Sequence, residues 1–129
     1  MAIHTELDIF KATYDLLTHV VKITRSIPRD FKDSIGRDLR RECTRLTVLI
    51  QKANMANDKS PFLIELLERL NVAEVLLRIC RDLRLIANSG FGEAIRLTQS
   101  IGRQANGWRT DTQKRLLSEG QGPQSRALF

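Results

Sequence analysis

The sequence PFLIELLERLNVAEVLLRICRDLRLIA, from Pro61 to Ala87, decides the fold. Read as a helix, it would be about 40 Å long at roughly 1.5 Å per residue. Its apolar residues recur at alternating spacings of three and four and form one seam: Leu63, Leu66, Leu70, Ala73, Leu77 and Cys80. Other apolar residues widen this seam: Leu67, Val75, Leu76, Ile79, Leu83 and Ile86. A helix this apolar has to be covered on several sides, so the stretch predicts the central helix of a helical assembly.

Both ends of this stretch carry helix signals. Ser60 can cap the free N–H groups of the first turn, and Pro61 suits the first helical position, where no N–H donor is needed. The sequence Asn88-Ser89-Gly90 follows, and Gly90 suits the left-handed turn that closes many helices. We therefore expect one uninterrupted helix over residues 61–87 and a tight turn over residues 88–92.

Two helices are predicted before this stretch. The first begins at a sequence that resembles a capping box, residues 5–8, and ends near Arg25. Its predicted core seam is Leu7, Phe10, Tyr14, Leu17 and Val21, flanked by Ile9, Leu16, Val20 and Ile23. Pro28 ends this helix, because the residue before a proline is pushed out of helical geometry. The second helix starts between Pro28 and Asp33 and runs to about Met55.

A fourth helix and a tail complete the chain. The helix spans about residues 91–118, with a helical spacing of Phe91, Ala94, Ile95, Thr98, Ile101, Ala105, Trp108, Thr112 and Leu116. Four helices joined by short connections predict an all-α fold, an antiparallel up-down-up-down four-helix bundle. We assign residues 1–118 to this bundle and residues 119–129, which are rich in Gly, Pro, Gln and Ser, to a flexible C-terminal tail.

Composition limits the compartment and the partners. The first residues lack a basic region followed by an apolar run, and no apolar run reaches the roughly 20 residues of a membrane span. We therefore expect a cytoplasmic protein with no membrane partner, in which Cys43 and Cys80 are reduced core residues. The net charge of +6 favours phosphate-bearing or acidic partners, whereas aromatic residues are too scarce, at 5%, for a base-stacking platform.

The candidate binding residues are arginines of the second and third helices. Arg37, Arg41 and Arg45 are four residues apart and share one face, where like charges repel by a few tenths of a kcal/mol per pair. The third helix carries arginines that we place on one side: Arg69, Arg78, Arg81 and Arg84. In a structural interpretation, acidic residues of the same helix, such as Asp38 and Glu42, offset this repulsion. In a functional interpretation, a bound polyanion or acidic groups of another subunit offset it.

Motifs for catalysis or cofactor binding are missing from the sequence. The histidines are His4 and His19, and no Glu-x-x-His, zinc-type cysteine spacing, phosphate-binding glycine loop or dinucleotide motif occurs. We therefore expect no enzymatic activity, no metal and no cofactor.

Two segments resemble a known family. Ser26-Ile27-Pro28-Arg29 followed by Ile35-Gly36 is similar to the first-turn signature of the four-helix-bundle proteins that include Avd. The run LLRICRDLRLI, residues 76–86, resembles the long third helix of that family, with Cys80 in place of the usual small alanine. Avd is the accessory variability determinant of diversity-generating retroelements, and relatives are encoded in intervening sequences of large-subunit ribosomal RNA genes. The resemblance covers about residues 5–117.

The resemblance implies a function as well as a fold. It implies a homopentameric, barrel-like ring with a basic surface and, for Avd, binding to a reverse transcriptase and to nucleic acid. The matching positions here are Arg37, Arg41, Arg45, Arg78, Arg81 and Arg84. The expected partners are thus other copies of the chain, RNA or DNA, and a reverse transcriptase. A structural or protein-interaction scaffold without nucleic-acid binding is the alternative.

Overall fold

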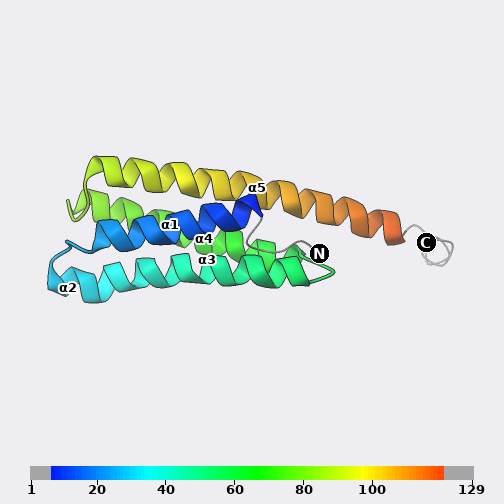
Figure 1. Cartoon of the computed structure of the whole chain (residues 1–129), viewed down its shortest axis with the longest axis horizontal. Helices are drawn as coiled ribbons and strands as arrows, with labels where there is room; N and C mark the ends of the chain where they lie inside the picture. The colour runs from blue at the N-terminus through cyan, green and yellow to red at the C-terminus, as the bar shows by residue number, and fades with distance from the viewer. Residues whose placement is uncertain (1–6, 121–129) are drawn as a thin grey trace.

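Four long helices make up the computed structural model, which describes residues 7–120 (Figure 1). The first, third and fourth are α1 (Asp8–Thr24), α4 (Ser60–Asp82) and α5 (Asn88–Gly120). The second is continuous but has three parts, namely α2 (Arg29–Phe31), a π-helical turn η2 (Lys32–Gly36) and α3 (Arg37–Met55). The described residues contain no strand, which confirms the all-α, four-helix prediction. Of the predicted flexible tail, residues 119–129, the first two residues belong to α5, and residues 121–129 lie outside the described residues.

The helices run alternately up and down and form a closed square (Figure 1). Helix α1 packs against α3 and α5, and α4 packs against the same two helices. Helices α1 and α4 therefore occupy diagonal corners and run in the same direction. The last turns of α5 extend past the ends of the other helices (Figure 1).

The core follows the seam predicted for the central helix. The buried residues of α4 are the six predicted ones, Leu63, Leu66, Leu70, Ala73, Leu77 and Cys80. Among the widening residues Ile86 is buried, whereas the others are only partly covered, and Val75 and Leu83 are 50% and 53% exposed. Within the single chain, α4 is therefore buried on one face and keeps apolar side chains on the opposite one.

The core-facing side of α1 differs from the prediction. The buried residues are Ile9, Ala12, Thr13, Leu16, Val20 and Thr24, whereas Tyr14 and Val21 of the predicted seam are exposed. The reason is that Thr13 and Thr24 are buried with their hydroxyl groups satisfied. They donate to the carbonyl groups of Phe10 and Val20 at 2.8 and 2.7 Å. A hydropathy pattern counts such threonines as polar and so selects the wrong side of the helix.

The central helix ends earlier than predicted. It stops at Asp82, and Arg84 has a φ of 58° in the left-handed region. The N–H of Leu85 donates to the Cys80 carbonyl at 2.8 Å, and the N–H of Arg84 donates to the Arg81 carbonyl at 2.9 Å. These two bonds form a Schellman motif with arginine at the position where glycine is usual. Arg84 therefore lies outside α4, in the connection to α5.

We expect Arg84→Gly to stabilise the protein by up to about 1 kcal/mol, because a left-handed backbone strains a residue that has a Cβ atom. Urea unfolding followed by circular dichroism measures the change. Ala87→Gly, in the same connection, is the control and should give no gain. A lower urea midpoint for Arg84→Gly than for the parent would contradict the assigned turn.

Two other end signals also act differently from the prediction. The N–H of Ser60 donates to the Asp58 carboxylate at 3.0 Å, so Asp58 supplies the side-chain acceptor and Ser60 does not act as a cap. Gly90 lies inside α5, which begins at Asn88, so residues 88–92 are not a turn. A Cβ atom at Gly90 would lie 3.0 Å from Ile23 Cγ2, so this glycine permits the close approach of α1. His19 Nε2 donates to the Gly90 carbonyl at 2.8 Å at the same contact.

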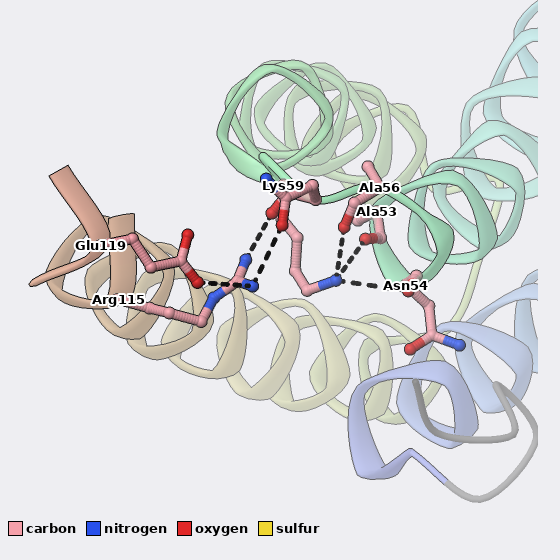
Figure 2. Close-up of polar contacts among 7 residues, drawn as sticks. Ala53, Asn54, Ala56, Lys59, Arg115 and Glu119 are labelled. Carbon is pink, nitrogen blue, oxygen red and sulfur yellow. Dashed lines mark hydrogen bonds and ion pairs between the residues drawn. The ribbon is translucent and has the colours of Figure 1, made fainter. Parts of the chain in front are cut away.

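Lys59 binds the end of α3, and Arg115 joins the α3–α4 connection to α5 (Figure 2). Lys59 Nζ donates to the carbonyl groups of Ala53, Asn54 and Ala56 at 2.9, 3.3 and 2.9 Å, and so caps the C-terminus of α3. Arg115 of α5 donates to the Asn57 backbone carbonyl. Burial, and then the positive charge of Arg115, lower the pKa of Lys59.

Within residues 7–120, no helix has the length and apolar character needed to cross a membrane.

Candidate nucleic-acid interface

The structure places the six predicted site arginines in two kinds of environment. Arg45 and Arg81 are half-exposed and form ion pairs. The other four are exposed and form no ion pair within the described residues: Arg37, Arg41, Arg78 and Arg84. The second group keeps its full hydrogen-bonding capacity for an external anion.

Two ion pairs connect α3 with α4 in opposite directions. Arg45 Nη2 lies 3.2 Å from Glu65 Oε2, and Arg69 Nη1 lies 3.2 Å from Glu42 Oε1. The expected partners within one helix are thus replaced by partners across two helices. The arginine side chains are 39% and 40% exposed, so each pair contributes at most about 1 kcal/mol.

These two pairs border a small notch of about 240 Å³, which Arg41 also lines. Glu42 Oε2 and Arg69 Nε are buried there without a hydrogen-bond partner in the described structure. The notch therefore carries three arginines against two glutamates, an excess of positive charge on this face of the bundle.

Arg81 contacts α5 instead of α3. Its guanidinium carbon lies 4.4 Å from the centre of the Phe91 ring, and Nη2 lies 3.0 Å from Asp82 Oδ1. Stacking on an aromatic ring is favourable for arginine, so Arg81 has a packing role. Arg69 reaches α3 and Arg81 reaches α5, so the prediction that the arginines of this helix share one side is wrong.

Three of the unpaired arginines lie toward one end of the bundle. Helix α3 begins and α4 ends at this end, where the α1–α2 and α4–α5 connections also lie (Figure 1). Arg37 starts α3, Arg78 lies in the last turns of α4, and Arg84 follows α4. Arg41 lies one turn further along α3. We call Arg37, Arg41, Arg78 and Arg84 the unpaired arginines.

A larger groove of about 750 Å³ lies between α4 and α5. Its lining includes Leu67, Leu70 and Glu74 of α4 and Arg103 and Arg109 of α5. The described residues contain no group of three or more His, Cys, Asp or Glu side chains that could hold a metal ion.

Both cysteines lie in the core, as predicted. Burial, and then the negative charge of Glu42, raise the pKa of Cys43 to about 12. Burial also raises the pKa of Cys80. Because the thiolate is the reactive form, neither side chain is set up for nucleophilic or redox chemistry.

We expect both thiols to be inert in the folded protein. At pH 8, a chromogenic disulfide reagent should react with neither cysteine on a timescale of minutes, and with both after unfolding in guanidinium chloride. Rapid reaction of one thiol in the folded chain would contradict the burial of that helix face.

The sequence did not reveal the partners of the paired arginines. Glu65 and Glu42 could have been found only from the register between α3 and α4, which spacing within one helix does not define. The contact of Lys59 with the end of α3 was also missed, although a lysine just after the predicted end of a helix is a recognised signal for that contact.

Comparison with known proteins identifies a family. A family model described as bAvd-like matches residues 7–112 of the chain, which is most of its length. No curated protein matches the chain.

Proposed function

Because the chain belongs to the bAvd-like family, we propose that it is a cytoplasmic, non-enzymatic accessory protein that binds nucleic acid. We also propose that it works as a homopentameric scaffold and that a reverse transcriptase is its protein partner, as the resemblance to Avd implies. The family membership itself supports the accessory role.

The observation that carries the nucleic-acid proposal is the set of unpaired arginines. A guanidinium group matches the geometry of a phosphate and is always charged. The chain has a net charge of +6, which attracts a polyanion to the protein. The arginines lie on helices and a fixed turn, and aromatic residues make up only 5% of the sequence, so we expect contacts to phosphates and little sequence readout.

A protein-interaction scaffold is the second candidate function. It is favoured by three ion-paired arginines of α3 and α4, namely Arg45, Arg69 and Arg81, whose charges the fold already uses. On this account the remaining arginines meet acidic groups of another protein.

A fluorescence-anisotropy titration with single-stranded RNA and DNA of unrelated sequences distinguishes the two functions. The proposal predicts similar affinities for different sequences at low salt, with the oligomeric mass measured on the same sample. An intact oligomer that binds neither polymer at low salt would leave only the scaffold function.

A further inference from the structure

Two helices carry rows of apolar side chains that the bundle does not cover. On α1, Tyr14 is 55% exposed and Val21 is 40% exposed, with the half-buried Leu17 between them. We call these three residues the α1 stripe. The α4 stripe contains Val72, Val75, Ile79 and Leu83, each at least 38% exposed. Both sets follow the three-and-four spacing of one helix face, so each is a continuous surface and not a scatter of single residues.

The fold directs the two stripes to opposite sides. Helices α1 and α4 occupy diagonal corners of the bundle, and each stripe lies on the outer side of its helix. Since α1 and α4 run in the same direction, a rotation about an axis along the bundle brings α4 of one copy beside α1 of the next in parallel orientation (Figure 1). Contacts between two different surfaces of identical chains produce rings when the rotation closes.

The charges that border the stripes are complementary. Lys11 precedes the α1 stripe by three residues and Arg25 follows it by four, so both lie on its face of the helix. On α4, Glu68 lies four residues before Val72 and Asp82 lies three after Ile79. The number of residues from Lys11 to Arg25 equals the number from Glu68 to Asp82. In parallel alignment each basic residue can therefore lie beside an acidic one. Asp82 already contacts Arg81, but a carboxylate has acceptor sites for a further partner.

We infer that copies of this chain associate head to tail, with the α1 stripe of one copy packed in parallel on the α4 stripe of the next. Lys11 and Arg25 then face Glu68 and Asp82 of the neighbouring copy. This inference rests on the proposed self-association and assigns its interface. Helix-on-helix packing of this kind buries the apolar groups that a single bundle leaves in water.

Two blocked variants test the pairing, each with a charge on one stripe only. Tyr14→Asp blocks the α1 stripe, and Val75→Asp blocks the α4 stripe. Each variant alone should be a monomer at concentrations where the parent is oligomeric, with its dissociation constant raised at least roughly 30-fold. Mixed in equal amounts, they should form a two-chain species, because the free α4 stripe of the first fits the free α1 stripe of the second. Leu117→Asp, at an apolar position of α5 that is 65% exposed, should keep the parent mass.

A charge exchange tests the same interface with substitutions that leave the apolar groups in place. Glu68→Lys with Asp82→Lys should weaken association at least about tenfold, and Lys11→Glu with Arg25→Glu in the same chain should restore it. Sedimentation velocity without nucleic acid gives all the masses. A monomeric parent would overturn both the proposed self-association and this interface. An oligomeric parent with blocked variants that keep the parent mass, or that stay monomeric when mixed, would overturn the interface alone.

Discussion

Leu77→Ala is expected to lower the free energy of unfolding by about 2–5 kcal/mol, the range for buried leucines truncated in well-packed cores. Leu77 is fully buried and belongs to the main core cluster, in the C-terminal third of the helix that packs against both α3 and α5. The substitution removes apolar contacts and leaves a cavity that rigid neighbouring helices cannot fill.

Urea unfolding monitored by circular dichroism measures this change. Leu117→Ala is the matched control, because Leu117 is 65% exposed and its truncation should change stability by no more than about 0.5 kcal/mol. Equal unfolding midpoints for Leu77→Ala and the parent would mean that the central seam is not the core.

A steep dependence of binding on salt is the second large effect. Each phosphate that an arginine neutralises releases counterions, so the log–log slope of affinity against salt should be roughly −0.7 to −0.9 per phosphate. An assembly that contacts about six phosphates loses about a thousandfold in affinity between roughly 50 and 200 mM salt. Repetition of the unpaired arginines in several copies of the chain makes contacts of this number attainable.

The slope is obtained from anisotropy titrations at four or more salt concentrations. Removing unpaired arginines should make it shallower by about one for each lost phosphate contact. Affinity that does not change with salt would rule out phosphate contacts as the source of binding.

The sequence predicted the parts of the fold that leucine spacing controls. All six seam residues of α4 are buried, because the leucines of this seam lie on one face of the helix. Prediction failed on α1, where Thr13 and Thr24 are buried by bonding to their own helix. It also failed at the end of α4, where a glycine six residues downstream suggested a later stop than the left-handed Arg84.

The candidate site was predicted less completely than the fold. The positions of the arginines follow from helical periodicity, but their partners depend on how neighbouring helices align. Arg45 contacts Glu65, which lies 20 residues away in the sequence, and Arg81 stacks on Phe91 of α5. The paired and unpaired arginines could therefore be told apart only from the structure. This distinction changes which residues a binding experiment should target.

The most direct test of the nucleic-acid account compares two variants with equal loss of charge. One carries Arg37→Gln, Arg41→Gln and Arg78→Gln, and the other carries the exposed-surface changes Lys52→Gln, Arg103→Gln and Lys114→Gln. With RNA at about 50 mM salt, we predict that the first variant loses at least roughly tenfold in affinity, whereas the second stays within about threefold of the parent. Equal losses in the two variants would contradict a localised site and leave net charge alone as the cause of binding.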